Sequence, residues 1–85
     1  APNPFNPRTT LAFRLPDRTT VGLRVYDLSG RVVRNLIAGA VYGPGRHAIV
    51  WNGADDAGRP LASGTYVCRL DAGDACATRR VTLLK

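Results

Sequence analysis

Short segments in which apolar and polar residues alternate recur along the whole chain, and glycine, proline, aspartate and asparagine separate them. Alternation with a period of two places every second side chain on one face, which is the pattern of a half-buried β-strand. Such segments cover residues 11–15, 21–25, 47–51, 65–70 and 76–84. Residues 31–37 are compatible with a short helix, but their density of β-branched side chains favours another strand. The pattern predicts six or seven strands in an all-β fold.

The length of the chain sets how these strands can hide their apolar faces. A chain of 85 residues forms one core, so its strands must close into a barrel or pack as two sheets. An antiparallel β-sandwich of about seven strands is the commoner solution at this size. We expect residues 8–85 to form this sandwich and residues 1–7, Ala-Pro-Asn-Pro-Phe-Asn-Pro, to precede it as an extended proline-rich segment.

The charge is strongly positive, because twelve Lys and Arg face six Asp and give a net charge of +6. Such a balance raises nucleic acids, membrane surfaces and acidic glycans as partners. The arginines are spread along the chain, and only Arg79, Arg80 and Lys85 approach a cluster. A solvated basic surface is therefore favoured over a specific nucleic-acid site, and a basic module that adheres to polyanions stays as a third hypothesis.

Two features of the sequence concern membranes and export. The longest apolar run, residues 36–42, is interrupted by a glycine and is far shorter than the about 20 residues that span a bilayer. The N-terminus shows no charged start followed by an apolar stretch. We expect no transmembrane segment, and any export signal is expected upstream in a longer parent chain.

Few residues suggest catalysis, and we expect no enzyme and no cofactor. His47, the only histidine, alternates in phase with Ile49 and Trp51, which indicates a packed or hydrogen-bonded side chain. The two serines stand before glycines in turns and lack the spacing of a nucleophile elbow. Asp55 and Asp56 are oxygen donors that suit calcium, but aspartates also form turns by accepting bonds from their own backbone, and this second interpretation is favoured.

Cys68 and Cys76 are the only cysteines. If residues 71–73 form a three-residue hairpin loop, the two cysteines face each other across the last two strands, at a separation that a disulfide accepts. We expect a Cys68–Cys76 disulfide, with two reduced thiols as the alternative. Without a second pair or a nearby histidine, a zinc site is not expected.

Four stretches of the chain form recognisable motifs, at residues 2–10, 25–33, 51–58 and 63–66. Their order resembles that of FlgD-like immunoglobulin-fold domains, which include the C-terminal sorting domains of type IX secretion substrates, and the likeness extends from residue 2 to residue 85. It implies a seven-stranded immunoglobulin-like, fibronectin III-like sandwich at the end of a larger extracellular or cell-surface protein. Asn52 stands where the family usually has aspartate, and Cys68 and Cys76 stand where aromatic or small residues are commoner.

The resemblance leads to two hypotheses of function. The first is a non-catalytic sorting or anchoring module that secretion machinery reads, and the alternative is a structural domain of an extracellular filament or a hook-capping scaffold. The last strand exposes an edge that a partner strand can join. The candidate recognition edge is Arg79, Arg80, Val81, Leu83 and Lys85. The proline-rich start is the candidate assembly arm toward neighbouring subunits of a homo-oligomer or filament, through Pro2, Pro4, Phe5 and Pro7.

Overall fold

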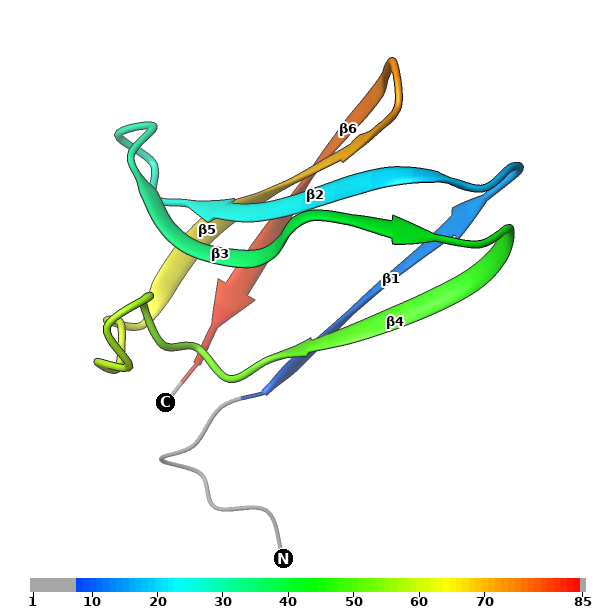
Figure 1. The fold of residues 1–85 in the computed structure, drawn as a ribbon. Coiled ribbons are helices and arrows are strands. Elements are labelled where there is room, and N and C mark those ends of the chain that lie inside the picture. The colour runs from blue at the N-terminus through cyan, green and yellow to red at the C-terminus, as the bar shows by residue number, and fades with distance from the viewer. Residues whose placement is uncertain (1–7, 85) are drawn as a thin grey trace, which may run out of the picture.

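The computed structural model describes residues 8–84, which form six β-strands in two antiparallel sheets (Figure 1). The strands are β1 (Thr9–Leu15), β2 (Thr19–Tyr26), β3 (Val32–Tyr42), β4 (Gly45–Trp51), β5 (Gly64–Ala72) and β6 (Ala75–Leu83). The described residues contain no seventh strand. The predicted arm residues Pro2, Pro4, Phe5 and Pro7, and the edge residue Lys85, lie outside the described residues. The same part of the chain has no helix with the length and apolarity to cross a membrane.

The strands follow the alternation of the sequence. One sheet contains β1 and β4, and the other has the order β3-β2-β5-β6. Both sheets are antiparallel throughout. Of the ambiguous residues 31–37, all but Arg31 belong to a strand, which continues past Gly39 to Tyr42. The predicted all-β fold is confirmed, with six strands in residues 8–84 where about seven were expected.

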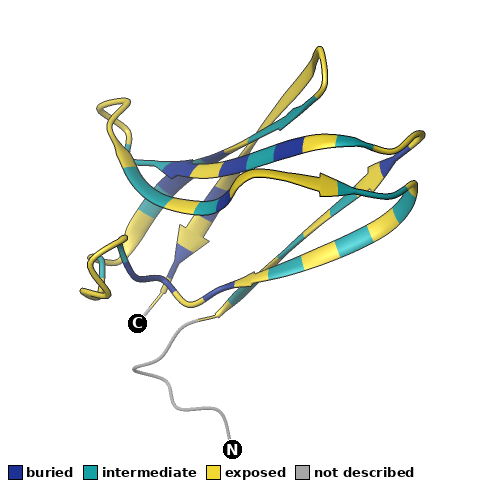
Figure 2. Ribbon diagram, in the orientation of Figure 1, coloured by how far each residue is buried: buried dark blue, intermediate teal, exposed yellow. Residues whose placement is uncertain are grey.

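The core lies between the two sheets and collects the inward-facing residues of the alternation (Figure 2). Trp51, Val21 and Val25 are fully buried, and Leu83 is 1% exposed. Burying a side chain of this size stabilises a fold by about 1.5–3 kcal/mol. The remaining buried apolar residues, Leu15, Leu23, Ile37, Ala54, Tyr66, Cys68 and Val81, come from both sheets and the loop after β4.

The two edges of the four-stranded sheet differ in regularity. The register between β2 and β3 shifts at three places, and Gly39, one of the residues passed over, has a φ of 75°. Such bulges bend and twist an edge and so hinder the addition of another strand. β6 instead pairs with β5 through nine consecutive residue pairs with no shift. β6 is therefore the uninterrupted edge of this sheet.

The hairpin between β5 and β6 corrects the predicted disulfide. The loop has two residues, because Ala72 faces Ala75, and Gly73 has a φ of 58°. A positive φ at the first loop residue alone is the pattern of a type II′ turn. Cys68 consequently faces Arg79, and Cys76 faces Asp71, with both cysteines free.

The error has a simple physical origin. The expected three-residue loop and the observed two-residue loop both use Gly73, but their registers differ by an odd number of residues. An odd shift turns side chains to the opposite face of a sheet. Cys68 is therefore buried in the core, whereas Cys76 is exposed on the outer face.

Thiol titration checks this arrangement. Burial raises the pKa of the Cys68 thiol to about 11, so little of it is the reactive thiolate at neutral pH. In the absence of reductant, we expect one thiol of the folded chain to react quickly and the second only after denaturation. The Cys76→Ser variant should lose the fast phase alone. A denatured, unreduced sample with no free thiol would show that the disulfide exists after all.

Candidate interaction surface

β6 presents the surface of the molecule best suited to strand pairing. Among the described residues 8–84, only β5 pairs with it, and no strand of that part of the chain lies along its other side. Alternate residues of an antiparallel edge strand turn their N–H and C=O groups away from the neighbour, where they are available to a partner strand. We call this outward side of residues Ala75–Leu83 the β6 edge.

The predicted edge residues divide into two groups by burial. Arg79 and Arg80 are exposed, and they place two positive charges at the middle of β6. The side chains of Val81 and Leu83 are buried in the core. These two residues offer a partner their backbone, while their side chains hold β6 to the sandwich.

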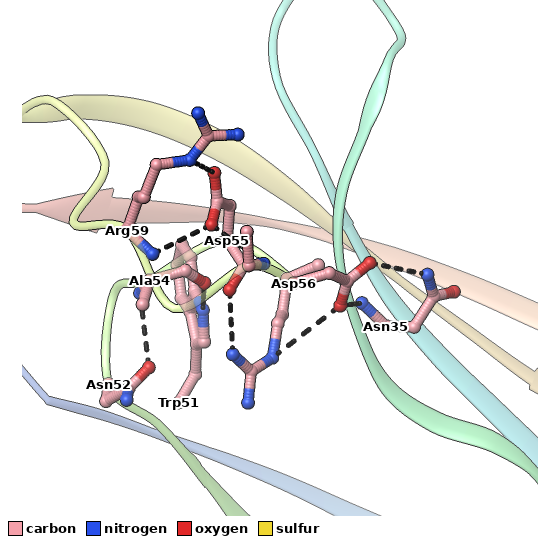
Figure 3. Close-up of polar contacts among 9 residues, drawn as sticks. Asn35, Trp51, Asn52, Ala54, Asp55, Asp56 and Arg59 are labelled. Atoms are coloured by element: carbon pink, nitrogen blue, oxygen red, sulfur yellow. Dashed lines mark hydrogen bonds and ion pairs between the residues drawn. The ribbon is translucent and has the colours of Figure 1, made fainter.

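Trp51, the first residue of a motif that carries the resemblance, has a structural role (Figure 3). Its ring is fully buried, and its Nε1–H donates to the carbonyl oxygen of Ala54 at 3.0 Å. Asn52 Oδ1 accepts from the Ala54 backbone N–H at 3.1 Å. The ring and the amide side chain thus fix the start of the loop that follows β4.

Asp55 closes a tight turn within this loop. Its Oδ1 accepts backbone N–H bonds from Ala57 at 3.0 Å and from Arg59 at 2.9 Å. Arg59 Nε lies 3.3 Å from Asp55 Oδ2 (Figure 3). The bond from the Arg59 backbone N–H is the main reason that the pKa of Asp55 lies below its ordinary value.

Asp56 fastens the loop to β3. Its two carboxylate oxygens accept from the backbone N–H of Asn35 at 2.8 Å and from Asn35 Nδ2 at 2.9 Å (Figure 3). These bonds lower the pKa of Asp56, and Arg34 Nε lies 3.9 Å from its Oδ1. Asp55 thus closes a turn through its own backbone, as predicted, whereas Asp56 accepts its bonds from β3 and not from the turn. Residues 8–84 hold no group of three or more His, Cys, Asp or Glu placed to bind a metal ion.

The turn between β2 and β3 has the same structure as the Asp55 turn. The sequence analysis did not detect this repetition. Both have the sequence Asp-x-x-Gly-Arg, as Asp27–Arg31 and as Asp55–Arg59. Asp27 Oδ1 accepts from the backbone N–H groups of Ser29 and Arg31, each at 3.0 Å. In both turns the Asp backbone N–H donates to the Arg carbonyl at 2.9 Å. The repeated pentapeptide was the signal in the sequence that could have revealed it. Two of the motifs that carry the family resemblance, residues 25–33 and 51–58, therefore contribute to forming turns.

These turns predict how stability depends on pH. Hydrogen bonds, chiefly from Ser29, also lower the pKa of Asp27 below its ordinary 3.8. Because these folded-state pKa values lie below the unfolded value, the ionised aspartates stabilise the fold above that pH. This contribution is lost as the pH falls through the folded pKa. We expect the melting temperature to drop below about pH 4, and the double variant Asp27→Asn/Asp55→Asn to show a smaller drop. An unchanged pH profile in the double variant would contradict this role.

His47 and Tyr66 are both satisfied within the fold. His47 Nε2 lies 2.8 Å from the carbonyl oxygen of Gly43, and its ring packs against Phe13 and Tyr42. This confirms the prediction of a packed, hydrogen-bonded histidine. The Tyr66 hydroxyl donates to the carbonyl oxygen of Ala62 at 2.6 Å, which is the bond of a tyrosine corner in immunoglobulin-like domains.

Comparison with known proteins gives one family. Residues 5–75 match the family model described as FlgD Ig-like domain. No curated protein matches the chain significantly.

Two solved structures share the fold. One is FlgD from P. aeruginosa, with 25% sequence identity and a TM-score of 0.65 over 91% of this chain. The other is FlgD from Xanthomonas campestris, a protein of the hook capping essential for flagellar assembly, with 20% identity and a TM-score of 0.67 over 94% of this chain. The matches span 60% and 56% of those two chains.

Proposed function

This chain belongs to the FlgD Ig-like domain family, and from that premise we propose that it is a non-catalytic structural module that joins protein subunits in an assembly. Its relatives are FlgD proteins, one of which serves in hook capping, and the family is in general one of scaffolds without enzymatic activity. The observation that carries the proposal is the β6 edge, an uninterrupted strand with a free side. A free, regular edge binds a neighbouring chain by continuing the sheet.

The design of the sandwich supports this role. The motif residues Trp51, Asp27 and Asp55 are used to bury the core and close turns. His47 packs in an aromatic cluster. These groups build a rigid frame, and the frame holds the β6 edge in the extended geometry that strand pairing needs.

Photo-crosslinking in the assembled parent protein tests the proposal. A photoreactive residue at Thr78, on the exposed outer face of β6, should give an adduct with a neighbouring protein subunit that mass spectrometry identifies. The same residue at Arg24, exposed on the middle strand β2, is the matched control and should give none. No adduct from Thr78, or equal adducts from both sites, would contradict the role of the β6 edge.

Light scattering separates two arrangements of such an assembly. A mass that rises with concentration means that copies of this chain join directly, as in the homo-oligomer or filament that the sequence suggests. A constant monomer mass means that the neighbour is a protein of another kind. High salt should be included, because it screens the repulsion between chains of net charge +6.

The sorting module for type IX secretion stays a second candidate, favoured by the exposed Arg79 and Arg80 on the last described strand. In this role secretion machinery would read the chain, and the parent protein would reach the cell surface or the medium. Fusion of residues 1–85 behind an exported reporter, in a host with that secretion system, is the test. Retention of the reporter in the periplasm would exclude this candidate.

A further inference from the structure

A groove runs along the open side of the sandwich between β1 and β6, and it deepens the role proposed for the β6 edge. Its volume is about 520 Å³, and its lining includes residues 9–14 of β1 and residues 79–82 of β6. Leu23, Cys68 and Leu70 of the larger sheet also line it. A second hollow of about 460 Å³ continues toward the β5–β6 hairpin and shares Arg14, Leu70 and Ala77 with the first. Together we call these two hollows the lateral groove.

The lateral groove has strand-pairing edges on both sides. Within residues 8–84, β1 pairs only with β4 and β6 pairs only with β5, so each strand has a side that no described strand occupies. Residue 9 lies near one end with residue 82, and residue 17 near the other with residue 75. The groove is therefore as long as a strand, and its occupant is an extended segment.

The inner face of β6 is only half covered by the core. Val81 and Leu83 are buried, whereas Ala77 and Arg79 are exposed although the pairing with β5 places them on the same face. Arg79 stands opposite the buried Cys68. An inner face with exposed positions leaves apolar surface for alternate side chains of an added strand to cover.

The charges of the lateral groove select the occupant. Arg14, Arg79 and Arg80 line its first hollow, and no Asp or Glu of the described residues joins them there. The carboxylates Asp17 and Asp74 line only the second hollow, together with Arg18. Clustered cations with low-dielectric walls attract acidic groups.

A second copy of β6 is a poor occupant. Antiparallel pairing of two copies about the middle of the strand sets Arg79 directly against Arg79, and like charges directly opposite destabilise a pair of strands. Residues 1–7 contain three prolines, which donate no ladder bond, and no acidic residue.

We infer that the lateral groove binds an extended segment of a different protein, in which apolar residues alternate with acidic ones. The segment continues the larger sheet beyond β6. Its apolar side chains cover Leu70 and Ala77, and its acidic side chains face Arg80 on the outer face of β6. This inference specifies the class of partner that the proposed structural module binds, and it rests on that proposed function.

Binding of a short fluorescent peptide tests the inference. The probe is a capped heptapeptide in which valine alternates with glutamate, and the matched peptide has glutamine in place of glutamate. We expect the acidic peptide to bind the folded chain and the neutral peptide to bind about tenfold more weakly. Arg80→Ser should weaken binding of the acidic peptide about threefold, which is the contribution of one exposed ion pair. Arg24→Ser, on the outer face, should change it less than about twofold.

Two further probes make the outcome specific. Ala77→Glu places a negative charge on an exposed inner position, and it should abolish binding of the acidic peptide while thermal unfolding shows an intact fold. Peptides of residues 75–83 and 1–7 represent a second copy and the proline-rich start. The inference would be overturned if the peptide of residues 75–83, the peptide of residues 1–7 or the neutral peptide bound as tightly as the acidic peptide. It would also be overturned if the acidic peptide did not bind.

The result also separates the inference from the proposed function. A Thr78 adduct in the assembly without binding of the acidic peptide would remove the acidic partner and keep the structural role. Binding of the peptide without any adduct would keep the groove as a peptide site and remove the structural role.

Discussion

Replacement of Trp51 by alanine is expected to lower the free energy of unfolding by about 3–5 kcal/mol, as for other buried large aromatic residues. The ring is fully buried, packs edge-on against Tyr66 at a centroid distance of 5.7 Å and fixes Ala54 through its Nε1–H. A domain of this length has a total stability of roughly 4–13 kcal/mol, so the variant should lose a large share of its stability. Chemical denaturation followed by circular dichroism measures the loss.

Trp51→Phe is the matched control for packing. It keeps an aromatic ring but leaves the Ala54 carbonyl oxygen without its 3.0 Å donor, and an unsatisfied buried group costs about 1–3 kcal/mol. We therefore expect a smaller loss than for alanine. A Trp51→Ala variant within about 1 kcal/mol of the parent chain would show that the sandwich does not depend on this residue.

The Leu83→Ala variant is expected to lose about 2–5 kcal/mol, because Leu83 is 1% exposed and a cavity would remain in the core. Leu84 is its neighbour in sequence but is 76% exposed, so Leu84→Ala should change the stability by less than about 0.5 kcal/mol. Thermal and denaturant unfolding of the two variants make the comparison. Equal losses would contradict the assignment of Leu83 to the core.

This pair of variants guides any experiment on the β6 edge. A defect in assembly or export caused by Leu83→Ala would reflect a destabilised sandwich. Arg79→Ser and Arg80→Ser change exposed side chains and should leave stability within about 0.5 kcal/mol. Only the arginine variants therefore report on recognition.

The sequence was sufficient for the strands because alternation decides which face is buried. Leu11 and Phe13 turn to the interior, and Val21, Leu23 and Val25 do the same on the facing sheet. Burial of one face fixes each strand, whatever its neighbours are. The bulges of β3 did not follow from this rule, because they depend on how Val33, Leu36 and Gly39 fit the register of β2.

The hairpin register was not determined by the sequence. Loops of two and three residues both suit Gly73, and the choice is decided by tertiary contacts such as the bond from the Gly73 N–H to the Thr20 carbonyl at 3.1 Å. The prediction of a disulfide was wrong because it depended on the register of a three-residue loop. The candidate edge on β6 did follow from sequence, since a last strand has a free side, but the lateral groove depends on where β1 lies relative to β6.

Hydrogen exchange of this chain, alone and within the assembled parent protein, tests most directly whether the β6 edge joins it to a neighbour. Pairing with a partner strand engages the outward N–H groups of an edge strand and protects them from exchange. We predict slower exchange in the assembly at residues 75–83 and unchanged exchange at residues 32–42 of the bulged edge. Unchanged exchange at residues 75–83, or slowing at residues 32–42 alone, would contradict this account.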